Sequence, residues 1–167
     1  RIFKDIAAVY FKIASAYATR SLDDSKPDIV QNQLYFILGE IAYLTGNSDL
    51  THLYLAKIPR SDRYASLGQI YLQLNDIRKK GRSGEKEPIR KLFEEFESTN
   101  AAYESFYLAN RLLTLDRKDL VPDKVEARLQ EKALAQEEKS KPVMAEMALF
   151  LKYRKQSLAA NQLLERA

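Results

Sequence analysis

The sequence predicts an all-α protein, an antiparallel array of helix pairs with about eight helices. The first observation behind this is that apolar residues recur at three- and four-residue steps in segment after segment, which is the period of a buried helical face. The second is a pattern, aromatic-x-x-Leu-Gly, which occurs at Tyr35–Gly39 and again at Tyr64–Gly68. Each copy places large side chains and a glycine along one helix, and a neighbouring helix can approach the backbone closely at the glycine. No segment shows the alternation of a β-strand with comparable strength.

The composition is that of a folded helical domain. The chain has 167 residues, of which 46% are hydrophobic and 30% charged, with 5 glycines and 5 prolines, so it can bury a core without covalent cross-links. It has no cysteine, which excludes disulfides and thiolate metal sites and leaves the cellular compartment open. Its net charge of +4 is a small excess beside that of dedicated nucleic-acid-binding domains. No apolar run approaches the roughly 20 residues needed to span a bilayer, so no transmembrane segment is predicted.

Four helices are expected in the first half of the chain. The chain starts at Arg1 inside an amphipathic pattern without a cap, which predicts a processed product or a fragment. Gly46 lies in a turn, and Ser48 or Asp49 is the expected N-cap of the short helix that follows it. Ser61 or Asp62 is the expected cap of the fourth helix. The expected helices are residues 2–18, 27–44, 49–57 and a fourth that ends near residue 78.

The second half begins with a change of composition. Residues 81–87 are charged and contain two glycines, which predicts a loop. We therefore divide the single domain into repeats at 1–80, the loop at 81–87, and C-terminal helices at 88–167 that continue and cap the array. Thr99 or Asn100 is the expected cap of the second of these helices. The expected helices are 88–98, 101–115, 122–140 and, without an internal Gly or Pro, one helix from 142 to the C-terminus.

Two interpretations of the last two helices remain open. In the first, the charged helix after Pro122 covers the end of the array, with Val125, Leu129 and Ala133 inward and Glu126, Arg128, Glu131 and Lys132 in water. In the second, the last helix leaves one side open for another subunit, a use that suits adaptable methionine surfaces. That side carries Met144, Met147, Leu151 and Leu158.

The segment from Tyr64 to Tyr71, YASLGQIY, resembles the first helix of the tetratricopeptide repeat, Trp-x-x-Leu-Gly-x-x-Tyr, with tyrosine in place of tryptophan. A copy with alanine in the glycine position lies at Tyr10 to Tyr17. The two glycines are about 29 residues apart, against about 34 in the family, and the resemblance covers about half of the chain. It implies an α-solenoid whose concave face binds a peptide or a partner domain. Carried over by position, the partner-binding residues are Phe11, Ser15, Phe36, Glu40, Tyr43, Gln69 and Leu72.

No motif predicts catalysis, a cofactor or a bound metal. His52 is the only histidine, and Asp49-x-x-His52 is a single copy of a motif that di-iron bundles need twice. Gly81–Lys86 lacks the Gly-Lys-Ser/Thr ending of a phosphate loop. Glu94, Glu95 and Glu97 are interpreted as a solvated helical face. The sequence therefore predicts a protein that is not an enzyme.

A basic cluster surrounds the predicted loop, and glutamates dilute it. It would attract phosphate backbones or an acidic partner. The leading interpretation is an interaction scaffold or adaptor that binds a protein, a peptide or another copy of itself within a larger assembly. The alternative is a helical nucleic-acid-binding module that uses residues 78–91. The cluster consists of Arg78, Lys79, Lys80, Arg82, Lys86, Arg90 and Lys91.

Overall fold

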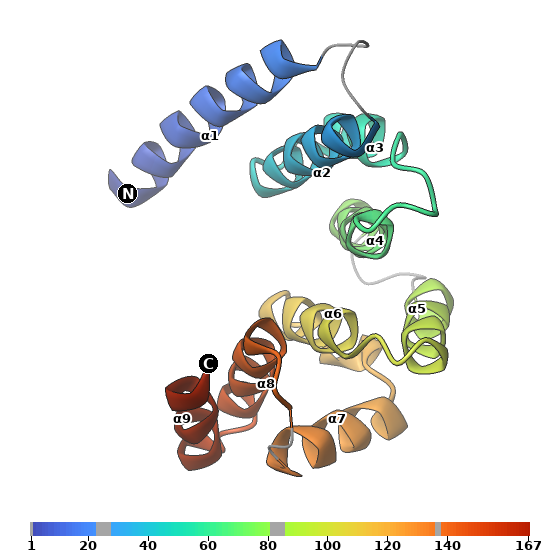
Figure 1. The fold of residues 1–167 in the computed structure, drawn as a ribbon, viewed down its shortest axis with the longest axis vertical. Helices are drawn as coiled ribbons and strands as arrows, with labels where there is room; N and C mark the ends of the chain where they lie inside the picture. Colours follow the sequence, from blue (N-terminus) through green and yellow to red (C-terminus); the bar gives the residue numbers. More distant parts are fainter. Residues whose placement is uncertain (1, 23–27, 81–85, 136–137) are drawn as a thin grey trace. The chain divides into compact units, whose positions relative to one another are not determined.

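A computed structural model describes the backbone of residues 2–22, 28–80, 86–135 and 138–167. Within these residues the chain forms nine α-helices and one short 3-10 helix, without a strand (Figure 1). The predicted all-α fold with about eight helices is therefore confirmed. No helix of the described residues is long and apolar enough to cross a bilayer. The chain divides into two compact units, residues 1–81 and 82–167.

The described residues of the first unit form four helices, and each helix packs on the next along the chain. Its core forms between α2, α3 and α4 from Leu38, Leu55, Ile70 and Leu74, each at most 2% exposed. The helix α4 also contacts α2 directly, so α3 lies beside both. The helices are α1 (Ile2–Ser21), α2 (Asp28–Leu44), α3 (Ser48–Leu55) and α4 (Ala65–Lys80).

The caps in this unit differ from those predicted. Asn47 is the N-cap of α3, and its side chain accepts a hydrogen bond from the Leu50 backbone N–H at 3.2 Å. The prediction of Ser48 or Asp49 was therefore one or two residues late. Asp62 does accept the backbone N–H of Tyr64 at 2.8 Å, but α4 itself begins at Ala65. Asp62 thus orders the turn that precedes α4.

The second unit is built around α8, which packs against α6, α7 and α9 (Figure 1). The rings of Phe106 on α6 and Phe150 on α8 meet edge to face at 5.7 Å, and both side chains are fully buried. Phe93 of α5 and Met147 of α8 are also fully buried. The elements are α5 (Lys86–Ser98), α6 (Ala102–Thr114), η1 (Lys118–Leu120), α7 (Asp123–Ala135), α8 (Lys141–Tyr153) and α9 (Ser157–Arg166).

The prediction of one helix from Pro142 to the C-terminus is wrong, because the chain turns between α8 and α9. Lys155 adopts a left-handed conformation with φ 60°. The backbone N–H of Gln156 donates to the carbonyl of Leu151 at 2.9 Å, and that of Lys155 donates to Lys152 at 3.1 Å. These two bonds form a Schellman motif, which ends a helix by satisfying its last carbonyls.

The same motif ends α2, α5 and α6, with Gly46, Asn100 and Asp116 in the left-handed position. Asn100 was predicted to begin the helix that follows it, and instead it ends α5. The N-cap of α6 is Ala101, whose side chain makes no capping bond. Asparagine and aspartate tolerate this conformation better than other residues with side chains.

Helix α7 buries the stripe that the sequence predicted, since Val125, Leu129 and Ala133 are all buried. Glu126 was expected in water, and this expectation is wrong because only 9% of the residue is exposed. Its carboxylate pairs with the guanidinium of Arg154 and lies 3.6 Å from the ammonium of Lys118. A buried carboxylate is tolerated when it is paired in this way.

The side of α8 that the second interpretation leaves open for a partner is covered within the second unit. Met144, Met147 and Leu151 are at most 3% exposed, which contradicts the open-face interpretation for these residues. Leu158 on α9 is 77% exposed. The apolar face of α8 is therefore part of the core of its own unit.

Candidate interaction surface

Four aromatic rings form a continuous row between α2 and α4, which we call the aromatic seam: Phe36, Tyr43, Tyr64 and Tyr71. The centroids of Phe36 and Tyr64 are 5.0 Å apart in a stacked pair, those of Phe36 and Tyr71 are 6.0 Å apart, and those of Tyr43 and Tyr71 are 5.1 Å apart. Residues seven apart share one face of a helix, which explains why Phe36 aligns with Tyr43 and Tyr64 with Tyr71. The pairing also shows that α2 and α4 run in the same direction.

An arginine closes each end of the aromatic seam. The guanidinium of Arg63 lies 4.7 Å from the centre of the Tyr64 ring and donates to the Tyr64 hydroxyl at 2.9 Å. The guanidinium of Arg78 lies 3.8 Å from the centre of the Tyr43 ring, and its Nη1 donates to the Tyr43 carbonyl at 2.7 Å. Both contacts are cation–π interactions, which hold the planar guanidinium against the ring and leave its other edges for ligands.

Glu40 lies midway along the seam. The hydroxyl of Tyr71 donates to its Oε1 at 2.5 Å. Because this bond uses one carboxylate oxygen, the second can accept from a ligand. The polar groups along the seam thus follow the order Arg63, Glu40, Arg78.

The seam has a buried inner half and an accessible outer half. Tyr71 and Tyr43 are 2% and 4% exposed, whereas Phe36, Tyr64 and Glu40 are half-buried. Arg63 and Arg78 are exposed. A partner would therefore contact Phe36, Tyr64 and the charged groups, while Tyr43 and Tyr71 form the buried layer on which they pack.

Of the residues predicted by the family resemblance, the structure brings Phe36, Glu40 and Tyr43 together on the seam. Gln69 is exposed but lies on another side of α4, because it is two residues, or about 200°, from Tyr71 around the helix. Leu72 is half-buried, about 100° from Tyr71 and on the side of α4 that contacts α3. The seven residues therefore do not form one surface.

The remaining predicted positions involve α1. Ser15 lines a pocket of about 280 Å³ between α1, α2 and α3, together with Leu38, Ile41 and Tyr54. The side chain of Phe11 lies outside the described part of the structure. This pocket is on a different side of α2 from the seam, since Leu38 is about 200° from Phe36 around the helix.

Sequence reasoning missed Arg63 as a seam residue. The only sequence signal for Arg63 was its position directly before Tyr64, the first ring of the row. Arg78 was noticed only as part of the basic cluster. The seven-residue spacing from Tyr64 to Tyr71 and on to Arg78 could have assigned it to the same helical face as the two tyrosines.

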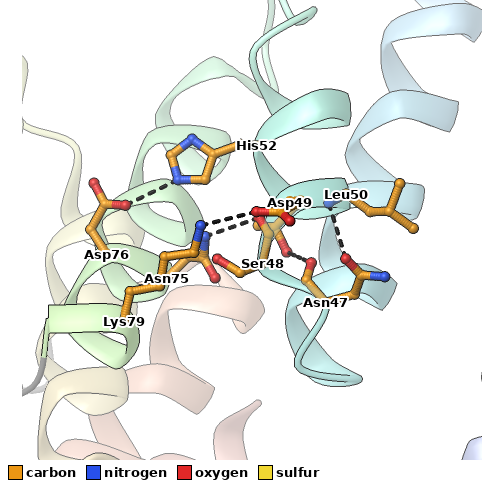
Figure 2. Close-up of polar contacts among 9 residues, drawn as sticks. Asn47, Ser48, Asp49, Leu50, His52, Asn75, Asp76 and Lys79 are labelled. Carbon is orange, nitrogen blue, oxygen red and sulfur yellow. Dashed lines mark hydrogen bonds and ion pairs between the residues drawn. The ribbon is translucent and has the colours of Figure 1, made fainter.

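A second group of polar contacts joins α3 to α4 (Figure 2). His52 Nε2 lies 3.0 Å from Asp76 Oδ1, and Lys79 Nζ donates to Asp49 Oδ1 at 3.1 Å. Asn75 donates to the backbone carbonyl of Ser48 at 3.3 Å. These hydrogen bonds, including the one between His52 and Asp76, hold α3 against α4. Among the described residues, no group of three or more His, Asp or Glu side chains could hold a metal ion.

The basic cluster of residues 78–91 is largely paired in the part of the chain that the structure describes. Lys79 pairs with Asp49, while Arg90 binds Glu87 at 2.6 Å and also pairs with Glu94. The hydrogen bond from Arg90 lowers the pKa of the Glu87 carboxyl below its ordinary value. Acidic partners therefore offset much of the charge that would attract a phosphate backbone.

The other members of the cluster divide between the two units. Lys91 Nζ lies 3.8 Å from Glu87, and Lys86 is exposed at the start of α5. The side chains of Lys80 and Arg82 lie outside the described residues. Arg78 and Lys79 belong to the first unit, whereas Lys86, Arg90 and Lys91 belong to the second.

Comparison of the chain with protein-family models, curated proteins and solved structures found no match.

Proposed function

We propose that the protein is a non-enzymatic interaction module that holds a protein or peptide partner on the aromatic seam. The observation that carries this proposal is the row of four rings, two of them half-buried, with an exposed arginine stacked at each end. Tyrosine and arginine are enriched among the residues that dominate binding energy at protein interfaces. Because the rings and guanidinium groups already pack on one another, binding would order few additional side chains.

The helical architecture supports the same proposal. Helical repeat arrays bind partners over the surface formed by successive equivalent helices. By the resemblance to tetratricopeptide repeats, α2 and α4 are the first helices of successive repeats, and the seam runs between them. A role as scaffold or adaptor within a larger assembly follows from such a surface. The paired charges of the basic cluster do not favour nucleic acid as the partner.

Photo-crosslinking at two exposed glutamines tests this function. Gln33 is on α2, one turn before Phe36 and beside the seam, whereas Gln69 is on another side of α4. Each glutamine is replaced in turn by a photoreactive amino acid, and the protein is crosslinked in the cells that produce it. The protein substituted at position 33 should crosslink to a discrete partner, and the protein substituted at position 69 should not. Addition of Arg63→Gln should weaken that capture.

Two outcomes would contradict the proposed function. One is equal capture from both positions, which would indicate non-specific contact. The other is capture from Gln69 alone, which would move the interface to the side of α4 that carries Gln69. Circular dichroism of both labelled proteins checks that the helices remain intact.

A further inference from the structure

The charges along the aromatic seam form an ordered row with positive ends and a negative centre. Arg63 stands at one end on Tyr64, and Arg78 stands at the other end on Tyr43. Glu40 lies between them, held by Tyr71. This order of charges restricts the choice of ligand more than the net charge of the seam does, because each charged group favours a ligand group of opposite charge at one position.

The turn before α4 carries one acidic residue, Asp62, beside two exposed arginines, Arg60 and Arg63, so it keeps an excess of one positive charge. Asp62 is adjacent to Arg63 in sequence, but its Oδ2 accepts from Asn32 at 2.9 Å and its Oδ1 accepts from the Tyr64 backbone at 2.8 Å. Arg60 is also exposed in the same turn and adds positive charge. The turn before α4 is therefore a basic end of the seam.

The length of α4 sets the distance between the backbones of the two arginines. From Ala65 to Arg78 an α-helix rises about 20 Å. An extended peptide covers about 3.3 Å per residue, so about six residues would span this distance. A helical ligand would need about thirteen residues for the same span.

We propose that the occupant of the seam is an extended acidic segment with two carboxylate side chains about six residues apart, one for each arginine. A lysine or another hydrogen-bond donor midway between them faces Glu40, and apolar side chains contact Phe36 and Tyr64. Each stacked guanidinium then binds a carboxylate through two N–H groups, the geometry in which arginine binds carboxylates best. This inference rests on the proposed function and specifies the chemistry of the partner.

Fluorescence anisotropy with two synthetic peptides tests the inference on the full chain. The first labelled peptide has two glutamates six residues apart, a lysine midway, and leucine and tyrosine elsewhere. The second has the same length and apolar residues, with two lysines and a central glutamate. At low salt the first should bind about tenfold more tightly, the difference expected from one or two charge-assisted hydrogen bonds. Added salt should reduce this difference.

Substitutions separate the roles of the three charged groups. Arg63→Gln and Arg78→Gln should each weaken binding of the first peptide, and Glu40→Gln should remove the preference for the central lysine. Lys79→Gln is the matched control, because it removes the same charge from the α3 side of α4 and should leave binding unchanged. Arg78 also donates a hydrogen bond to the Tyr43 carbonyl, so its substitution can disturb the fold as well as the binding site. Thermal melts of Arg78→Gln and of Arg78→Lys, which keeps the positive charge, distinguish loss of binding from loss of fold.

Equal affinity for the two peptides would overturn the inference, and so would binding that Arg63→Gln does not weaken. Absence of binding by either peptide would also overturn it. None of these outcomes affects the Gln33 crosslink, which reports occupation of the seam by any partner. Failure of the acidic-segment inference and failure of the proposed function are therefore distinguishable.

Discussion

Gly39 on α2 and Leu55 on α3 pack so closely that the space between them excludes a side chain at position 39. A Cβ atom built on Gly39 would lie 2.3 Å from Leu55 Cδ2 and 2.4 Å from its Cγ. Leu55 is 2% exposed and lies in the core of the first unit, so it has little room to move. The glycine thus permits the close approach of α2 and α3.

Gly39→Ala should therefore destabilise the first unit. Insertion of a methyl group into a packed core costs about 1–3 kcal/mol, although the gain in helix propensity offsets part of this. Chemical denaturation followed by circular dichroism measures the change.

Gly68→Ala is the matched control, because a Cβ at Gly68 would meet Ile58 at 3.6 Å, an ordinary contact. That substitution should be neutral or stabilise by about 0.5–1 kcal/mol. If both substitutions behave alike, the close contact of Gly39 has no energetic role.

The parts of the fold that were predictable from sequence are those in which local periodicity and tertiary packing agree. Val125, Leu129 and Ala133 form a helical stripe in the sequence and are buried in the structure. Gly39 interrupts an apolar face, which already indicated a close helix contact. In both cases the signal lies within one helix.

The sequence-based predictions fail where a residue adopts a backbone conformation or a degree of burial that is unusual for its type, or where its partner is distant in sequence. Lys155 ends α8 in a conformation that glycine usually adopts, so no breaker marked the turn. Glu126 is buried because Arg154, far along the chain, neutralises it. The seam likewise depends on which helices become neighbours, so sequence alone did not separate Gln69 from the residues that line the seam.

Lys155→Gly should stabilise the second unit. A residue with a Cβ atom in the left-handed region costs about 1 kcal/mol relative to glycine, and Lys155 has φ 60°. The gain should appear as a higher melting temperature. Lys152→Gly is the contrasting control, since it places glycine inside α8 and should cost about 1 kcal/mol. A lower melting temperature for Lys155→Gly would contradict the Schellman geometry at this turn.

The ion pair between Arg117 and Asp119 should make stability depend on pH. Arg117 Nε donates to Asp119 Oδ1 at 2.9 Å, and this hydrogen bond holds the pKa of the Asp119 carboxyl below its ordinary value of 3.8. A carboxyl whose pKa is lowered in the folded state stabilises the fold above its unfolded pKa, and this contribution is lost as the pH falls through the folded pKa. The stabilisation is therefore present at neutral pH and disappears in acid.

Asp119→Asn should lower the melting temperature at neutral pH by a small amount, because the Asp119 side chain is 52% exposed and solvent screens the pair. The difference from the natural sequence should shrink below about pH 4. Thermal melts over a series of pH values measure it. A difference that stays constant across the series would mean that the substitution acts through the shape of the turn instead of the charge.

Removal of α8 and α9 should abolish cooperative unfolding of the second unit. Truncation after Ser140 uncovers Phe106, which is fully buried against Phe150. Loss of contacts around a buried aromatic residue costs about 3–5 kcal/mol, a large part of the stability of a small domain. The truncated chain should aggregate or melt without a sharp transition in circular dichroism.

Truncation after Gln156 is the matched control, because it removes only α9 and leaves the contact of Phe106 with Phe150 intact. It should lower the melting temperature and keep the transition cooperative. A soluble, cooperatively melting chain that ends at Ser140 would contradict a core built around α8, since α5, α6 and α7 would then fold without it.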